Sequence, residues 1–160
     1  MPWTITPEPT DSPAAVALWR AYYTEVSDRW YLRHQGRTTD PAELEREIAA
    51  DTGKDLTLLL VARYDTTPAG TAGIRLTPDP TTAELTRVFL LPHLRGKGGA
   101  TRLVTAAEQA ARDLGATRMI LDTRSDLVEA RTLYARLGYE ETGPHNTDPY
   151  AEHWFSKRLT

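Results

Sequence analysis

The 160-residue chain contains no cysteine, which excludes disulfide bonds, thiolate metal sites, iron–sulfur clusters and a cysteine nucleophile. It also lacks a charge excess. Its 19 Lys and Arg and 22 Asp and Glu leave a formal net charge of −3, which predicts neither a nucleic-acid partner nor a membrane-binding patch. No apolar run approaches the ~20 residues that cross a bilayer. The proline-rich N-terminus has no basic residue before Arg20, so we expect no targeting peptide and a cytoplasmic protein.

What remains is an ordinary globular composition, 40% hydrophobic and 26% charged, without repeats or linkers, so a single domain over residues 1–160 is predicted. Helical spacing and capping residues predict helices that begin near Ala14, cover 41–50 and 98–114, and start again at a cap on Asp126. Strands are expected at 3–6, 56–63, 69–76, 83–91, 118–123, 139–141 and 153–159.

The order of these elements predicts a mixed α/β fold. Three consecutive strands with tight turns, at 56–63, 69–76 and 83–91, indicate an antiparallel meander. The helix between 83–91 and 118–123 indicates a crossover between parallel strands. The expected fold class is therefore a mostly antiparallel central sheet of six to seven strands, with helices on both faces.

A glycine-rich loop joins the strand at 83–91 to the helix that follows it. Gly96, Gly98 and Gly99 allow several main-chain N–H groups to converge beside the positive end of the helix, and Arg95 and Lys97 add two cations. This combination indicates a site for a phosphate or diphosphate. The alternative is a plain turn, which is disfavoured because three glycines and two cations coincide between an apolar strand and a helix.

Neither common nucleotide-binding motif fits this loop. A Walker loop requires a glycine where Leu91 stands and Ser or Thr where Gly98 stands. A Rossmann fingerprint is incomplete because Thr101 replaces its last glycine, although Asp122 lies at a strand end further along the chain. A nucleotide-binding module that takes NAD or ATP is therefore the weakest of the alternatives.

Two motifs together resemble the GNAT N-acetyltransferase superfamily. The loop Arg95-Gly96-Lys97-Gly98-Gly99-Ala100 matches its Arg/Gln-x-x-Gly-x-Gly/Ala signature. The stretch Leu133-Tyr134-Ala135-Arg136-Leu137-Gly138-Tyr139-Glu140 resembles its Leu-Tyr-x-x-Leu-Gly-Phe/Tyr hallmark. The resemblance covers residues 56–159 by element order. It implies that the fourth and fifth strands are parallel and splay apart, with acetyl-coenzyme A as cosubstrate in the opening and no metal.

The resemblance also implies roles for particular residues. The main chain of Phe89, Leu90 and Leu91 would pair with the pantetheine arm, and an amide there would hold the thioester oxygen. The pyrophosphate would be bound by the amides of Arg95, Gly96, Lys97, Gly98, Gly99, Ala100 and Thr101. Tyr134 would protonate the departing thiolate, the alternative being a tyrosine that only packs in the core. The family often has Asn where this chain has Leu127, and Ser125 and Asp126 are the candidates to replace it.

The acceptor is expected to be an amine, which must be neutral to attack. For a lysine-like amine this costs about 4.6 kcal/mol at pH 7, so a base is expected. The resemblance implies Glu84 as the candidate, because several relatives have a carboxylate that acts through water at this place on the fourth strand. The alternative is a strand carboxylate that pairs with Arg75 or Arg87 across the sheet. Glu25, Asn146 and Tyr150 are the predicted acceptor-binding residues. Three aromatic residues of the first helix also have the spacing of core residues, namely Trp19, Tyr22 and Tyr23.

The resemblance, together with these residues, implies a bacterial-type N-acetyltransferase that transfers an acetyl group from acetyl-coenzyme A to a primary amine of a small molecule by direct attack. The alternative of another class is a non-catalytic acyl-coenzyme A binding or sensing module. The sequence does not identify the acceptor amine, and it does not distinguish a peptide acceptor from a small molecule. It also leaves the oligomeric state open, a homodimer included.

Overall fold

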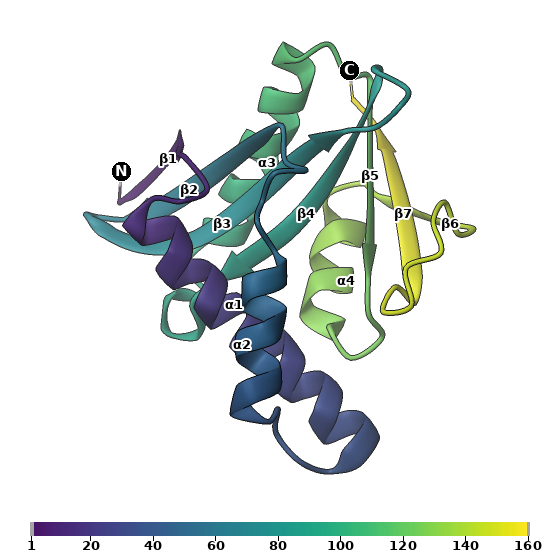
Figure 1. Ribbon diagram of the computed structural model, residues 1–160. Coiled ribbons are helices and arrows are strands. Elements are labelled where there is room, and N and C mark those ends of the chain that lie inside the picture. Colours follow the sequence, from purple (N-terminus) through teal and green to yellow (C-terminus); the bar gives the residue numbers. More distant parts are fainter. Residues whose placement is uncertain (1, 160) are drawn as a thin grey trace.

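The computed structural model describes residues 2–159, which form a sheet of seven strands in the order β1-β2-β3-β4-β5-β7-β6 (Figure 1). The strands are β1 (Trp3–Pro7), β2 (Leu58–Tyr64), β3 (Thr67–Leu76), β4 (Thr82–Leu90), β5 (Arg118–Thr123), β6 (Glu140–Thr142) and β7 (His153–Arg158). The helices are α1 (Pro13–Gln35), α2 (Pro41–Ala50), α3 (Gly99–Asp113) and α4 (Val128–Arg136), with one turn of 3-10 helix, η1, at Pro92–Leu94. The mixed α/β prediction is confirmed. No helix in this part of the chain is long and apolar enough to cross a membrane.

Strands β4 and β5 pair only at one end. The predicted meander β2-β3-β4 is antiparallel, and α3 then carries the chain to β5, which runs parallel to β4. The parallel ladder has three residue pairs and ends at Glu84 and Ile120, although β4 continues to Leu90 and β5 to Thr123. Figure 1 shows the two strands diverging beyond this point, with α4 visible in the opening. The predicted splay is confirmed.

A β-bulge in β4 lies within the splayed part of the strand. Thr71 of β3 pairs with Phe89 and Gly73 with Thr86, so β4 has one extra residue between these pairs. Arg87, within the bulge, has a φ of 53°, a left-handed conformation unusual for a residue other than glycine. Because a bulge bends its strand and increases its twist, it favours the divergence of β4 from β5.

Helices cover both faces of the sheet. Helices α3 and α4 cover one face, where the main core lies; its buried residues include Ile74, Leu85, Leu103, Met119, Leu121, Leu133 and Phe155. Helix α1 packs on the other face through Ala15, Leu18 and Trp19 against Leu59 and Val61. Val16, three residues before Trp19 on the same helix, does not share this packing and is 52% exposed.

The starts of two helices show which capping predictions hold. Ser12 caps α1, since its side chain accepts a hydrogen bond of 3.1 Å from the N–H of Ala15. The prediction that Asp126 caps α4 is wrong, because the cap residue is Leu127 and no side chain caps that helix. The Asp126 carboxylate instead accepts two hydrogen bonds of 3.0 Å from Arg124. The Asp126 carboxylate thus binds the Arg124 guanidinium instead of the main-chain N–H groups at the start of α4.

Candidate active site

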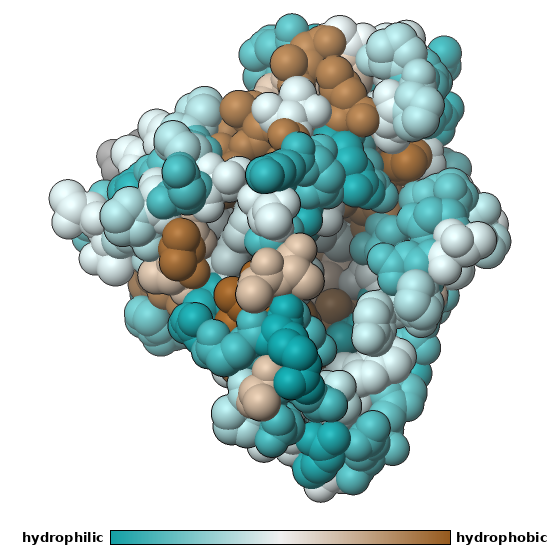
Figure 2. Space-filling model, viewed as in Figure 1, coloured by the Kyte–Doolittle hydropathy of each residue, from teal (hydrophilic) through white to brown (hydrophobic). Residues whose placement is uncertain are grey.

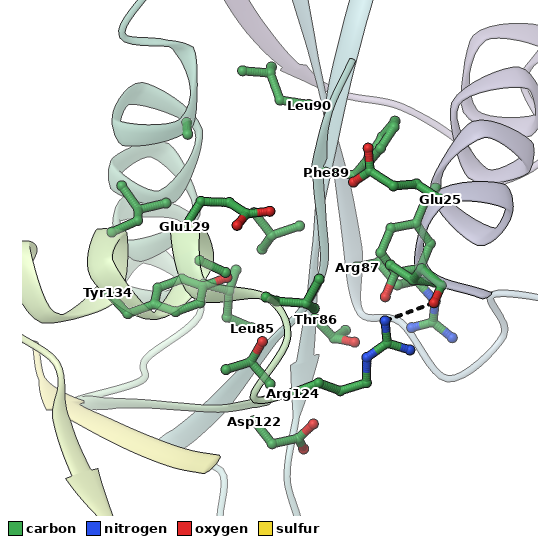
Figure 3. Close-up of a pocket in the computed structure, with 18 of the residues that line it drawn as sticks. Glu25, Leu85, Thr86, Arg87, Phe89, Leu90, Asp122, Arg124, Glu129 and Tyr134 are labelled. Atoms are coloured by element: carbon green, nitrogen blue, oxygen red, sulfur yellow. Dashed lines mark hydrogen bonds between the residues drawn. The ribbon is translucent and has the colours of Figure 1, made fainter. Parts of the chain in front are cut away.

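The opening between β4 and β5 contains a cavity of about 800 Å³. Its walls come from α1, β4, β5, α4 and the loop that leads into α3 (Figure 3). Figure 2 shows a largely hydrophilic face with apolar atoms at the bottom of a hollow near its centre. The cavity is therefore lined by elements from both faces of the sheet, and side chains from segments far apart in the sequence meet in it.

The glycine-rich loop has the geometry of an anion-binding nest. Gly96 and Gly98 both have a φ of 80°, and a Cβ built on either would meet no atom within 4 Å. The N–H of Arg102 is bonded to the carbonyl of Gly98 at 3.3 Å, so the amides of 99–101 belong to the first helical turn and have no partner within the helix. Six residues of the loop and the first turn of α3 line the cavity, namely Arg95, Gly96, Gly98, Gly99, Ala100 and Thr101.

The third glycine and the lysine of this loop have structural positions. A Cβ on Gly99 would lie 2.4 Å from the ring of Trp3, so glycine is required there for packing. The carbonyl of Lys97 accepts a hydrogen bond of 3.0 Å from Nε1 of Trp3, and the Lys97 ammonium lies over the ring of Tyr64. Lys97, predicted to bind the pyrophosphate, does not line the cavity. Arg136 of α4 does, with Nη2 lying 3.4 Å from the Thr101 hydroxyl.

Arg95 and Glu25, which were predicted to serve different substrates, are partners. Arg95 Nη2 lies 2.8 and 3.0 Å from the two carboxylate oxygens of Glu25. Its Nε donates to the carbonyl of Leu90 at 2.9 Å. Both side chains line the cavity, where they join the nest to α1 and to β4. Their ion pair thus holds the loop against the helix that forms the opposite wall.

The predicted pantetheine-binding segment presents only part of its main chain to the opening. The N–H of Leu91 donates to the carbonyl of Ala69 at 2.8 Å, and Leu91 does not line the cavity. Phe89 and Leu90 do line it. Because the N–H and C=O of one strand residue point to the same side, the bond from Arg95 to the Leu90 carbonyl identifies Leu90 as the residue whose amide faces away from β3.

Tyr134 lies at the base of the opening. Its side chain is 5% exposed, and its ring packs edge-on against Tyr139 at 5.6 Å between centroids. Burial raises the pKa of the Tyr134 hydroxyl, and nearby Tyr22 and Asp122 raise it further, so the hydroxyl keeps its proton at neutral pH. Figure 3 shows the Tyr134 ring reaching into the cavity from α4. The residue combines core packing of its ring, the alternative role, with access of its hydroxyl to the cavity.

Glu84 occupies the point where β4 and β5 separate. It is the last residue of β4 paired with β5, it lines the cavity, and it is 7% exposed. Arg75, directly opposite on β3, donates to its Oε1, as the cross-strand alternative predicts. Arg75 also donates to Asp55 at 2.8 Å. The second carboxylate oxygen of Glu84 has no partner in residues 2–159.

The predicted acceptor-binding residues lie in two places. Tyr150 lines the mouth of the cavity, 54% exposed, with its ring 4.9 Å from that of Trp30. Asn146 does not line it, and instead donates from Nδ2 to Oδ2 of Asp122 at 2.8 Å. Asp122 itself faces the cavity, a role the sequence did not assign to it. A single acidic residue within an apolar strand was the available signal.

At the position where the family often has asparagine, this chain presents an apolar side chain to the cavity. Leu127 lines the cavity, whereas Ser125 and Asp126 do not. Ser125 is hydrogen-bonded to His153 at 2.9 Å, and Asp126 to Arg124. In residues 2–159, no three His, Asp or Glu side chains are grouped as metal ligands.

Comparison with known proteins agrees with this geometry. Residues 16–139 match the acetyltransferase (GNAT) family. The chain is 44% identical over 57 residues to the uncharacterized N-acetyltransferase YjgM of Escherichia coli, an alignment covering 36% of this chain and 34% of that protein. It is 32% identical over 111 residues to human N-acetyltransferase 8B, covering 66% and 47% respectively. The chain thus spans between a third and half of the length of these relatives.

Among solved structures, the chain resembles the PaiA N-acetyltransferase of Thermoplasma acidophilum, which was crystallised with coenzyme A. The TM-score is 0.72 with 17% sequence identity, and the alignment covers 99% of both chains. At this identity the likeness concerns the fold. Together with the family match over most of the chain, it leads to one conclusion: this protein belongs to the GNAT acetyltransferase family.

Proposed function

We propose that the protein is an N-acetyltransferase that transfers the acetyl group of acetyl-coenzyme A to a primary amine of a small molecule. The main support is the nest at 96–101, which opens into the same cavity as Tyr134. Open space at Gly96 and Gly98, together with the amides of the first turn of α3, which have no partner within the helix, suits a diphosphate. Arg136 adds a cation from α4. The family and the coenzyme A complex of PaiA agree with this cosubstrate.

In this proposal the reaction takes place in the gap beyond Glu84 and Ile120. The thioester supplies an activated acetyl group, and the amide of Leu90 holds its carbonyl oxygen. The neutral amine attacks the carbonyl carbon, an N–C bond forms and the C–S bond breaks. Tyr134 gives its hydroxyl proton to the thiolate. A thiol has a pKa of about 8.5, so a phenol whose pKa is raised by burial needs close contact with the sulfur for this transfer.

Glu84 is the proposed base. Its carboxylate lines the cavity on the face covered by α1 and α2, and one oxygen is left after Arg75 occupies the other. That oxygen would receive the amine proton through a water molecule. Glu25 and Tyr150 would form the acceptor side, with Tyr150 at the mouth and Glu25 beside Arg95. Asn146 would act on the acceptor through Asp122.

The test is an amine screen in which release of coenzyme A is measured with a thiol reagent, followed by Tyr134→Phe. Loss of a general acid is expected to lower kcat by about 100-fold or more, with the affinity for coenzyme A unchanged. If the protein binds coenzyme A but no amine in the screen causes coenzyme A to be released from acetyl-coenzyme A, the acyl-coenzyme A sensing module would be favoured. Preferential binding of NAD or ATP would favour the nucleotide-binding module. The single domain, the cytoplasmic location, the bacterial type and the homodimer stay predictions.

A further inference from the structure

Asp122 faces the cavity from the splayed part of β5, two residues beyond the last pair with β4. Its neighbour Leu121 is buried in the main core beneath α3 and α4. Because side chains alternate along a strand, Asp122 points to the opposite face, which α1 and α2 cover. Asp122 and Tyr134 line the cavity from different elements, β5 and α4, and both are labelled in Figure 3. The carboxylate is thus on the acceptor side of the opening, and its charge contributes to the raised pKa of the Tyr134 hydroxyl, the proposed acid.

One oxygen of this carboxylate is held in place. Oδ2 of Asp122 accepts the hydrogen bond from Asn146 Nδ2 at 2.8 Å. The orientation of the Asn146 amide is determined by two donors on its Oδ1, namely Trp154 Nε1 at 3.1 Å and the N–H of Asp148 at 3.2 Å. The amide must therefore present its NH₂ group to Asp122. In residues 2–159 no hydrogen bond reaches Oδ1 of Asp122, so this oxygen is available to a ligand.

Asp122 also differs in charge balance from most other carboxylates around the cavity. Four of them are in ion pairs with arginines, namely Glu25, Asp55, Glu84 and Glu129. Asp122 has no cationic partner within residues 2–159, and neither do Glu47 and Asp148. Glu47 lies on α2 and Asp148 on the exposed loop before β7. Asp122 is the carboxylate without a counter-charge that lies on the splayed strands themselves.

We infer that Asp122 binds the ammonium group of the acceptor and holds the amine beside the thioester. This inference rests on the proposed function and adds the source of its preference for amines. A charge-assisted hydrogen bond from the ammonium group to Oδ1 of Asp122 orients the nitrogen at the open edge of β5. An alcohol gains no such ionic contact, so the site selects protonated primary amines. One ammonium proton then passes to the base, and the freed lone pair attacks.

The test uses Asp122→Asn, in which the new Oδ1 can still accept the hydrogen bond from Asn146. Acetyl transfer is measured with 2-phenylethylamine, tryptamine and 1,4-diaminobutane, and the best of these is the probe for KM. We expect Asp122→Asn to raise the KM for the amine by about tenfold or more. The Kd for coenzyme A is expected to stay unchanged. Asp122→Ser is measured in parallel, so that the result does not depend on one variant.

Asp148→Asn is the matched control. It removes another cavity carboxylate without an ion pair while keeping an oxygen that accepts the N–H of Tyr150. An unchanged amine KM in both Asp122 variants would overturn the inference and leave the proposed function intact. An equal rise in Asp148→Asn would also overturn it, because the effect would then be one of general negative potential. Coenzyme A binding without turnover of any amine by the unmodified protein would overturn the proposed function as well.

Discussion

Arg87 and Asp51 form a two-point ion pair that joins the bulge of β4 to the end of α2. Arg87 Nε and Nη2 lie 2.7 Å from Oδ2 and Oδ1 of Asp51, and the two side chains are only 12% and 8% exposed. The left-handed backbone of Arg87 belongs to the bulge, and Asp51 directly follows α2. This pair therefore holds the acceptor-side helices against the part of β4 that leaves β5.

Replacing Asp51 by asparagine is expected to lower the free energy of unfolding by about 3 kcal/mol, because it leaves a largely buried guanidinium with a weakened partner. Urea unfolding at pH 7 measures the change. Glu45→Gln is the control, since the pair of Glu45 with Arg20 is solvent-exposed and its loss should cost less than about 1 kcal/mol. Equal losses in the two variants would contradict the structural role given to Asp51.

The same variant is expected to change the acid dependence of stability. Burial alone would raise the pKa of Asp51, but hydrogen bonds from Arg87 and Tyr23 outweigh it and leave the pKa below its usual value. A lowered pKa in the folded state stabilises the protein above the unfolded-state pKa of about 3.9, and this stability is lost as pH falls through the folded-state pKa. The difference between the unmodified protein and Asp51→Asn should therefore shrink below about pH 4.

Gly98→Ala separates the anion site from the strain of the loop. A side chain at φ 80° costs about 1–2 kcal/mol of stability, although the space around Gly98 is open. It would also occupy the nest, so the Kd for coenzyme A should rise by about tenfold or more. Gly115→Ala is the control, because Gly115 also has a positive φ and open space but follows the far end of α3. Calorimetry measures the Kd for coenzyme A, and equal values for Gly98→Ala and Gly115→Ala would contradict the anion-binding role of the nest.

Glu84→Gln distinguishes the proposed base from the cross-strand ion pair. If Glu84 is the base, Glu84→Gln is expected to lower kcat by about 100-fold and to leave the Kd for coenzyme A unchanged. If Glu84 is only structural, the variant is expected to lose thermal stability, because the ion pair with Arg75 is weakened, and to show little change in kcat. Measuring kcat and the unfolding midpoint on the same preparation decides between the two roles, and an unchanged kcat would remove Glu84 from the mechanism.

Much of the fold followed from local patterns. Alternating residues between turn signals predicted the meander, and the apolar spacing of α3 between two strands predicted the parallel crossover. The nest was also predictable, because glycine spacing and the start of a helix are properties of adjacent residues. The cap of α4 was not, since Arg124 competes for the Asp126 carboxylate. Nor was the left-handed Arg87, whose residue type gives no sign of a bulge.

The amino-acid sequence by itself determined which segments become strands and helices and where main-chain amides converge, because these depend on neighbours within a few residues. Only the tertiary structure decided which charges meet. It paired Arg95 with Glu25, turned Lys97 toward Tyr64 and placed Asn146 on Asp122 rather than in the cavity. Such contacts join side chains from separate elements, and their partners depend on the register and divergence of strands that no local pattern specifies.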